Sequence, residues 1–227
     1  MDFMQSYKKW LKDDYFDEET KKELEAIEDN EKEIEDRFYK NLEFGTGGMR
    51  SKIGAGTNRI NKYTIRRATQ GFANYIINYY EEDGKTSGAV IAYDPRHKSA
   101  EFALETALVL AANNIKTYLF DSLRPTPELS FAVRELEACG GIVITASHNP
   151  IQWNGLKFMD SDGRFLSPGK AEQVYKMADE GRIDLKNWDA LGTVEKDENA
   201  NQRHIAAVKN LSYIDLEGLR KRKFKVA

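Results

Sequence analysis

Short apolar runs alternate with segments in which apolar residues recur every three or four positions, from about residue 41 onward. The runs predict strands, and the spaced segments predict amphipathic helices that cover them. The predicted strands are 89–93, 116–120, 142–144 and 155–159, and the predicted helices are 65–79, 99–112, 126–139 and 167–178. Strands that alternate with helices need crossover connections, so we expect an α/β fold of three α/β/α layers around a mostly parallel mixed sheet.

Polar and small residues mark where these elements begin and end. Ser99 is expected to cap one helix, and Thr126 to cap another with Pro127 as its first residue. Gly140 and Gly141 are expected to close the latter helix. The first long helix is expected to stop near residues 82–84.

Residues 1–40 differ from the rest in charge and pattern. They hold 14 acidic and 8 basic side chains, and their apolar residues fall at helical multiples between long polar intervals. We therefore expect a separate N-terminal helical arm, followed by one domain over 41–210. Residues 211–227 are expected to hold a linker and the first strand of a second domain that is cut short.

Composition excludes several classes of partner. The 227-residue chain has a net charge of -3, which provides no broad positive field for nucleic acid or anionic lipid. The longest apolar run is the six residues 107–112, and the N-terminus has no apolar signal segment, so no membrane partner is expected. One cysteine, Cys139, fits a reducing cytoplasm.

The densest group of chemically active residues is Thr-Ala-Ser-His-Asn-Pro at 145–150. It directly follows a predicted strand, at the sheet edge where open α/β folds bind ligands. The alternative is a hydrogen-bonded turn. A hydrolase triad is disfavoured, because neighbouring side chains such as Ser147 and His148 point apart in extended backbone and the chain has no G-x-S-x-G motif.

A glycine-rich cluster at 45–56 includes one guanidinium, that of Arg50. Glycines let backbone N–H groups approach an anion, and arginine donates in pairs to phosphoryl oxygens, so the cluster is a candidate phosphate cradle. It lacks the features of a nucleotide P-loop or a dinucleotide fingerprint. A plain glycine-rich turn is the alternative.

Six motifs, in order, resemble the α-D-phosphohexomutases, and especially the phosphoglucomutase and phosphopentomutase type. They are Phe-Gly-Thr-Gly-Gly-Met-Arg at 44–50, Gly-Ala-Gly-Thr-Asn at 54–58, Tyr-Asp-Pro-Arg at 93–96, Pro-Thr-Pro at 125–127, Thr-Ala-Ser-His-Asn-Pro at 145–150 and Asn-Gly-Leu-Lys at 154–157. The resemblance implies the first domain of such an enzyme, with Ser147 as a phosphoserine that interconverts sugar 1-phosphate and 6-phosphate through a sugar bisphosphate.

The resemblance also assigns roles around Ser147. Arg50, His148 and Lys157 would surround the phosphoserine, and Thr46 with Arg50 would help to bind substrate. Mg²⁺ would be held by an oxygen of phosphorylated Ser147 and by aspartates of a following domain, outside this chain, and a sugar 1,6-bisphosphate would act as activator. Lys157 would move protons on the sugar hydroxyl, which requires burial or nearby cations to lower its pKa.

The resemblance implies a sugar phosphate as the small-molecule partner. Glucose phosphate leads, with pentose phosphate and mannose phosphate as alternatives, and a non-catalytic fragment that binds a sugar phosphate is the rival from another class. We expect the 227-residue chain alone to be inactive as a mutase, unable to complete the turnover, because the ligands of the following domains are missing.

Several residues carry a plainer expectation. Ser51 stands where many relatives have glycine, so a positive φ there would strain the backbone next to Arg50. The segment 160–164 mimics an aspartate metal loop but lacks its third carboxylate, and is expected to be a turn. Asn149 is expected to lock its loop, and His97 and His204 to be surface or packed histidines.

Overall fold

The computed structural model describes residues 2–43, 48–178, 191–222 and 224–225. Its central element is a six-stranded sheet in the order β1-β5-β4-β2-β3-β6. The strands are β1 (Met49–Lys52), β2 (Ala89–Tyr93), β3 (Thr117–Phe120), β4 (Gly140–Ile144), β5 (Trp153–Asp160) and β6 (Val194–Asp197). β4, β2, β3 and β6 run parallel, whereas β5 is antiparallel to both β4 and β1. The expected mixed, mostly parallel sheet is confirmed.

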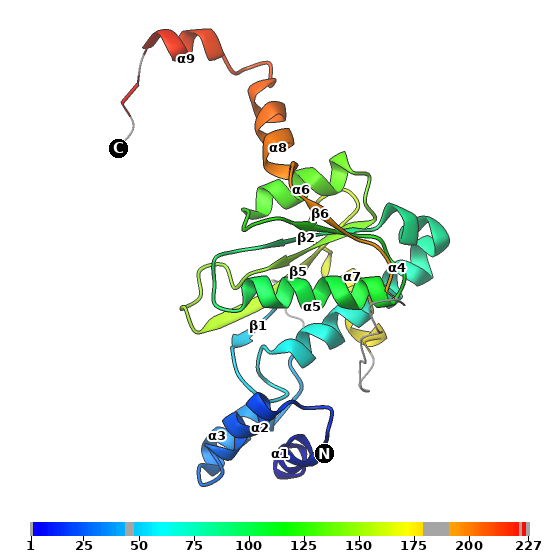
Figure 1. The fold of residues 1–227 in the computed structure, drawn as a ribbon, viewed down its shortest axis with the longest axis vertical. Coiled ribbons are helices and arrows are strands. Elements are labelled where there is room, and N and C mark those ends of the chain that lie inside the picture. Colours follow the sequence, from blue (N-terminus) through cyan, green and yellow to red (C-terminus); the bar gives the residue numbers. More distant parts are fainter. Residues whose placement is uncertain (1, 44–47, 179–190, 223, 226–227) are drawn as a thin grey trace.

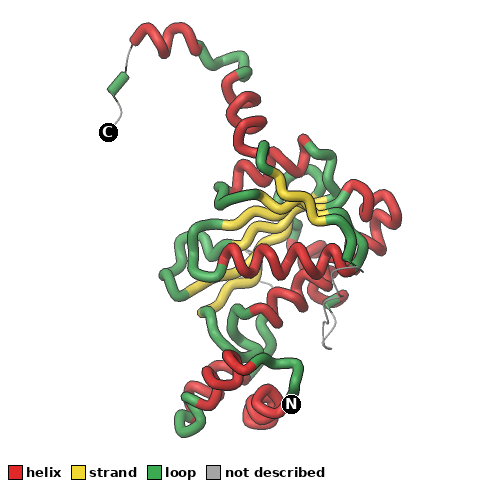
Figure 2. The backbone as a smooth tube through the Cα atoms, viewed as in Figure 1, coloured by secondary structure: helices red, strands yellow, loops and turns green. Residues whose placement is uncertain are grey.

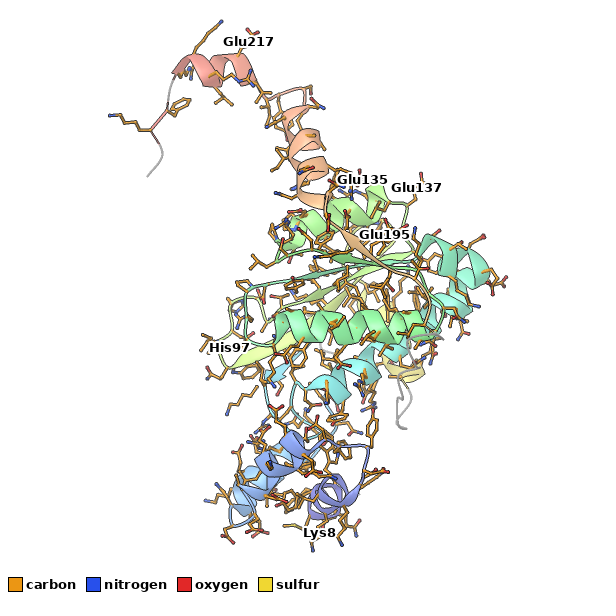
Figure 3. The ribbon with its side chains drawn as sticks, viewed as in Figure 1. Lys8, His97, Glu135, Glu137, Glu195 and Glu217 are labelled. Atoms are coloured by element: carbon orange, nitrogen blue, oxygen red, sulfur yellow. The ribbon has the colours of Figure 1, made fainter. Side chains whose placement is uncertain are left out.

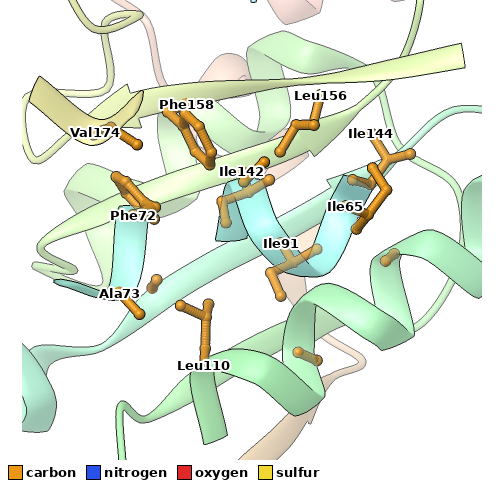
Figure 4. Packing of buried hydrophobic residues seen from close by; sticks show 14 of the residues in the cluster. Ile65, Phe72, Ala73, Ile91, Leu110, Ile142, Ile144, Leu156, Phe158 and Val174 are labelled. Atoms are coloured by element: carbon orange, nitrogen blue, oxygen red, sulfur yellow. The ribbon is translucent and has the colours of Figure 1, made fainter. Parts of the chain in front are cut away.

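Helices cover both faces of this sheet, as Figures 1 and 2 show. α4 (Lys62–Ser87), α5 (Ser99–Ala112) and α7 (Pro168–Met177) lie on one face, and α6 (Thr126–Glu135) lies on the other, with α8 (Ala200–Lys209) beside it and only the first residue of α8 buried. Figure 4 shows the larger core, where side chains of β2 and β4 meet those of α4 and α5. Phe72 of α4 stacks on Phe158 of β5 with ring centroids 4.6 Å apart. The fold is therefore the expected three-layer α/β/α arrangement.

The N-terminal helical arm is present as α1 (Phe3–Lys12), α2 (Glu18–Glu25) and α3 (Glu31–Phe38). It has its own apolar cluster, in which the rings of Trp10 and Phe16 stack at 4.0 Å. The cluster includes Tyr63 of α4, and Arg37 of α3 donates a hydrogen bond to the carbonyl oxygen of Ala55 at 3.2 Å. The arm thus packs against the loop that joins β1 to α4. β1 is the strand that carries Arg50.

Two predicted helix caps are each displaced by one residue. Ser99 is the first residue of α5, and Lys98, with φ of 61°, is its N-cap. The Ser99 hydroxyl donates to Asp94 instead of capping the helix. Pro125, not Thr126, is the N-cap of α6. The first long helix was expected to stop near residues 82–84, and α4 has a kink there: the backbone of Glu81 is non-helical, and helical residues then continue to Ser87.

The two glycines at 140–141 belong to β4 instead of closing α6. A Cβ at Gly140 would lie 2.7 Å from the Met159 carbonyl oxygen, and one at Gly141 would lie 2.7 Å from a methyl carbon of Val133. These glycines therefore allow β5 and α6 to pack close to β4. In the sequence, a glycine pair inside such a strand looks the same as a glycine pair that ends a helix.

The ends of the chain add elements that the pattern did not predict. β1, β6 and α8 were not expected, and α9 (Leu216–Arg222) occupies part of the segment where we expected a linker and a strand. Residues 223 and 226–227 of that segment lie outside the described residues. Within the described ranges, no helix is long and apolar enough to cross a membrane.

One close contact between α4 and α7 makes a test of this packing. A Cβ at Gly71 would lie 2.4 Å from the Val174 carbonyl oxygen, whereas nothing lies within 4 Å of a Cβ at Gly169, an exposed position of α7. We expect Gly71→Ala to lower the free energy of unfolding by about 1–3 kcal/mol, because α7 must move. Gly169→Ala should leave it unchanged or raise it by up to about 1 kcal/mol. Urea unfolding measures both, and equal effects of the two substitutions would contradict this packing.

Candidate functional site

The segment 145–150 forms a loop at the carboxyl end of β4, and its third residue emerges into solvent. Thr145 and Ala146 are buried, whereas Ser147 and His148 are exposed. β4 pairs in parallel with β2, so this loop lies beside the loop that follows β2. The Ser147 hydroxyl is therefore exposed at the sheet edge where open α/β folds bind ligands.

Ser147 has a left-handed backbone, with φ of 59°. Its hydroxyl oxygen lies 3.4 Å from Nδ1 of His148. The expectation that these two side chains point apart is therefore wrong, because it assumed extended backbone. The contact alone does not make a hydrolase triad, which also needs a third group to orient the imidazole.

Two cations lie on the strands beyond β4: Lys157 on β5, which is next to β4, and Arg50 on β1, which follows β5 in the sheet. Arg50 of β1 pairs with Gly155 of β5, and Lys157 lies two residues further along β5, so both side chains point to the same face of the sheet. Glycines make room for their stems: a Cβ at Gly155 would lie 2.9 Å from Cγ of Arg50, and one at Gly48 would lie 2.6 Å from Cγ of Lys157.

Arg50 also contacts the loop directly. One guanidinium nitrogen donates to the side-chain oxygen of Asn149 at 3.5 Å. Asn149 therefore joins the loop to β1, which agrees with its expected role in locking the loop. The contact also keeps the positive charge of Arg50 beside Asn149, which is two residues after Ser147 in the chain.

The environment of Lys157 favours loss of its proton. Burial, and secondarily the positive charge of Arg50, lower the pKa of Lys157 from its ordinary value. The ring of Phe165, with its centroid 4.8 Å from Nζ, favours the charged form and so opposes this shift. The direction of the shift in the pKa of Lys157 is therefore the one that a proton-moving lysine requires.

Sequence reasoning missed the residues that hold the loop, Asp94 and Arg96. One carboxylate oxygen of Asp94 accepts from the Thr145 hydroxyl at 2.7 Å, and the other accepts from the Ser99 hydroxyl at 2.8 Å. Arg96 donates to four backbone carbonyl oxygens between Ser147 and Trp153. The sequence feature that could have identified them is an aspartate and an arginine just after a buried strand. No neighbouring residue in the sequence indicates which groups they bind.

Other candidates have mixed outcomes. Thr46 lies outside the described residues. Ser51 is in β1, is not among the residues with positive φ, and donates its hydroxyl proton to the Asn58 carbonyl oxygen at 2.8 Å. The strain considered for this position is therefore absent.

The segment 160–164 forms the expected turn, with Gly163 at φ of 76°. Its two carboxylates already have cationic partners, Asp160 with Lys170 and Asp162 with Arg164. His97, labelled in Figure 3, is exposed on the loop after β2, and His204 is partly buried with its ring 5.2 Å from that of Phe131.

The groups around Ser147 suit an anion better than a metal ion. Arg50 and Lys157 are cations, and the Asp94 carboxylate is already occupied by hydroxyl donors and by Arg96. Over the described parts of the chain, no group of three or more His, Cys, Asp or Glu side chains is placed to hold a metal ion. An anionic ligand fits this charge pattern better than a cation does.

Comparison with known proteins finds a matching family and similar sequences. Residues 41–183 match the family described as phosphoglucomutase/phosphomannomutase, alpha/beta/alpha domain I. A phosphoglucomutase of Staphylococcus epidermidis is 47% identical over 133 residues, which cover 59% of this chain and 24% of that protein. One of Staphylococcus aureus is 45% identical over 148 residues, covering 65% and 26%. The matched part of the chain thus spans about a quarter of the length of these relatives.

Solved structures show the same fold. A candidate phosphomannomutase from Thermus thermophilus superposes with a TM-score of 0.67 at 29% identity, over 79% of this chain and 38% of the other. The open form of the Paramecium phosphoglucomutase parafusin superposes with a TM-score of 0.60 over 77% of this chain and 36% of the other. At 18% identity, that second likeness bears on the fold alone.

The left-handed backbone of Ser147 can be tested by two substitutions that both remove the hydroxyl. Ser147→Gly should be more stable than Ser147→Ala by roughly 1 kcal/mol, because only glycine adopts positive φ without steric cost. Ala100→Gly, at an exposed helical position of α5, should instead be destabilising. Urea unfolding measures the three, and a Ser147→Ala variant as stable as Ser147→Gly would count against the left-handed backbone.

The effect of Arg50 on Lys157 can be measured by titration. Arg50→Met should raise the pKa of Lys157, because a neighbouring positive charge disfavours the ammonium form, while burial keeps that pKa below its ordinary value. NMR of ¹³C-methylated lysines follows the titration, with Lys157→Arg to assign the signal. The pKa of Lys170, which its hydrogen bond to Asp160 raises, should not move. An unchanged pKa of Lys157 would show that Arg50 exerts no such effect.

Proposed function

The chain belongs to the phosphoglucomutase/phosphomannomutase family, and on that premise we propose that Ser147 carries the phosphoryl group of a sugar-phosphate mutase. The observation that supports this role is an exposed hydroxyl at the carboxyl edge of the sheet, with Arg50 and Lys157 on the two strands beyond it. The chain spans about a quarter of its curated relatives, so catalysis by the whole protein is part of the proposal.

The proposed reaction conserves phosphate. Phosphorylated Ser147 gives its phosphoryl group to a free hydroxyl of a sugar monophosphate: the bond from phosphorus to the serine oxygen breaks and one to the sugar oxygen forms. The resulting bisphosphate then returns its other phosphoryl group to Ser147. The net change is a sugar 1-phosphate converted to a 6-phosphate, or the reverse.

Charge complementarity supports the anionic serine. A phosphoserine carries about -1.5 to -2 charge at neutral pH, and its oxygens need cationic or N–H donors. Arg50 is joined to the loop through Asn149 and provides a guanidinium that can donate to two phosphoryl oxygens. Phosphoryl transfer depends mainly on position and on neutralised oxygens, so this arrangement suits it without an elaborate base.

Proton movement is assigned to Lys157. When neutral, its amine would take the proton of the attacking sugar hydroxyl, and as the ammonium it would return that proton in the second transfer. Burial, and secondarily the charge of Arg50, lower the pKa of Lys157, so its neutral form is more accessible than that of an ordinary lysine. His148, whose Nδ1 is 3.4 Å from the Ser147 hydroxyl oxygen, would hydrogen-bond at the serine oxygen, and Thr46 with Arg50 would contact the substrate.

Magnesium remains part of the proposal, but no step above depends on it. An oxygen of phosphorylated Ser147 would be one ligand, with the remaining ligands outside this chain, and the ion would supply further neutralisation of the phosphoryl oxygens. The proposed substrate is glucose phosphate, as in the relatives named phosphoglucomutases. Pentose phosphate and mannose phosphate are the alternatives, a sugar 1,6-bisphosphate is the proposed activator, and the cytoplasm is the proposed location.

The decisive test is transfer of a phosphoryl group to Ser147. We expect the 227-residue chain, incubated with glucose 1,6-bisphosphate with and without Mg²⁺, to gain one phosphoryl group by intact-mass spectrometry. Ser147→Ala should gain none, and Ser161→Ala, at an exposed serine of the turn after β5, should behave like the unsubstituted chain. A chain that stays unmodified under both conditions would favour a non-catalytic domain that binds a sugar phosphate, and the proposal would fall.

A further inference from the structure

We infer that Arg96 is a positioning residue, which holds the backbone of the Ser147 loop in the geometry that phosphoryl transfer needs. The inference rests on the proposed function for its catalytic consequence. Its structural part, that one guanidinium maintains the conformation of the loop, stands on the contacts alone.

The guanidinium of Arg96 gathers four backbone carbonyl oxygens from the loop. One terminal nitrogen donates to Ser147 and Asn149, both at 2.7 Å. The other terminal nitrogen donates to Pro150 at 2.9 Å and to Trp153 at 3.1 Å. These bonds join the loop after β2 to residues that are 51 to 57 positions further along the chain.

The two peptide groups on either side of the Ser147 Cα atom are each connected to Asp94 through one intervening side chain. The Ser147 N–H donates to the Thr145 hydroxyl oxygen at 2.9 Å, and that hydroxyl donates to Asp94 at 2.7 Å. The Ser147 carbonyl oxygen accepts from Arg96, whose Nε lies 3.2 Å from the same Asp94 oxygen. Two connections, one through Thr145 and one through Arg96, therefore hold Ser147 at its amide and at its carbonyl.

This double connection explains how a serine keeps its unusual backbone. A left-handed non-glycine residue, such as Ser147 at φ of 59°, is sterically unfavourable and persists only where its surroundings determine it. Here the carbonyl bond to Arg96 and the amide bond to Thr145 set the peptide planes on both sides. The left-handed turn in turn brings the Ser147 hydroxyl to His148.

Arg96 acts by shape more than by charge. It uses its donors on neutral carbonyl oxygens and pairs with Asp94, unlike Arg50, whose side chain lies on the face of the sheet with Lys157. A planar fork with five N–H donors can bind four oxygens at once, whereas a lysine has three donors at one point. Misplacement of a reacting atom by about 1 Å can cost about 100-fold in rate. Arg96→Lys should therefore preserve charge but lose position.

The experiment compares Arg96→Lys and Arg96→Ala with the unsubstituted 227-residue chain. Hydrogen–deuterium exchange should rise at least tenfold at the amides of 147–149 in both variants, while β4 and the helices keep their protection. The rate of phosphoryl uptake at Ser147 from glucose 1,6-bisphosphate should fall about 100-fold. Added methylguanidinium should restore part of that rate to Arg96→Ala, and methylammonium should not.

Arg164→Lys is the matched control, because Arg164 is a highly exposed arginine that bonds Asp162 in the turn after β5. It should change neither exchange in the loop nor phosphoryl uptake. Should Arg96→Ala fail to fold, Arg96→Lys and Thr145→Val are compared by the same readouts. Thr145→Val cuts only the amide connection and should also raise exchange at Ser147.

The readouts separate the two proposals. Unchanged loop exchange in Arg96→Lys would overturn the positioning role, whatever happens to the rate. Rescue by methylammonium as well as by methylguanidinium would also overturn it, since charge alone would then suffice. If the unsubstituted chain takes up no phosphoryl group, the proposed function fails, and the exchange measurement still decides whether Arg96 holds the loop.

Discussion

The parallel pairing of β2 with β4 is the constraint on which the site depends. Because Ala89–Tyr93 pair residue by residue with Gly140–Ile144, both strands end at the same level and their following loops lie side by side. Asp94 and Arg96 follow β2, and the loop of Ser147 follows β4, so the hydrogen bonds between them need no further chain movement. The buried, regular part of the sheet thereby sets the position of an irregular and exposed segment. A shift of this register by one residue would separate the loops and reverse the faces of the side chains.

The second half of the site comes from the antiparallel part of the sheet. β5 returns beside β4 and pairs with β1, which places Lys157 and Arg50 on the same face of the sheet. Glycines at 48 and 155 leave space for the two stems, so the cations can lie close enough for Arg50 to lower the pKa of Lys157. The exposed Ser147 hydroxyl after β4 and the two cations on β5 and β1 thus come from different parts of the chain. This arrangement would suit the proposed phosphoryl transfer, which depends on a positioned acceptor and neutralised oxygens.

The accuracy of the sequence predictions follows the range of the interactions involved. β2 was predicted with correct bounds, because its continuous apolar run records burial on both faces. The loop of Ser147 was located correctly, because it follows such a run. Arg96 was missed as a functional residue, because its partners are more than fifty positions away and are backbone atoms, which carry no sequence signal. The orientation of Ser147 relative to His148 was predicted wrongly, because extended backbone was assumed where long-range contacts impose a left-handed turn.

The sequence by itself determined the types of the main elements, the α/β class, the family and the identity of the candidate serine, lysine and arginine. Those features rest on local periodicity and on motifs of a few adjacent residues, which need no knowledge of neighbours in space. The tertiary structure decided the order and direction of the strands, the membership of Gly140 and Gly141 in β4, and the arrangement of Asp94, Thr145 and Arg96 around Ser147. These depend on strand register and on hydrogen bonds to backbone groups distant in the chain, so they exist only once the sheet has formed.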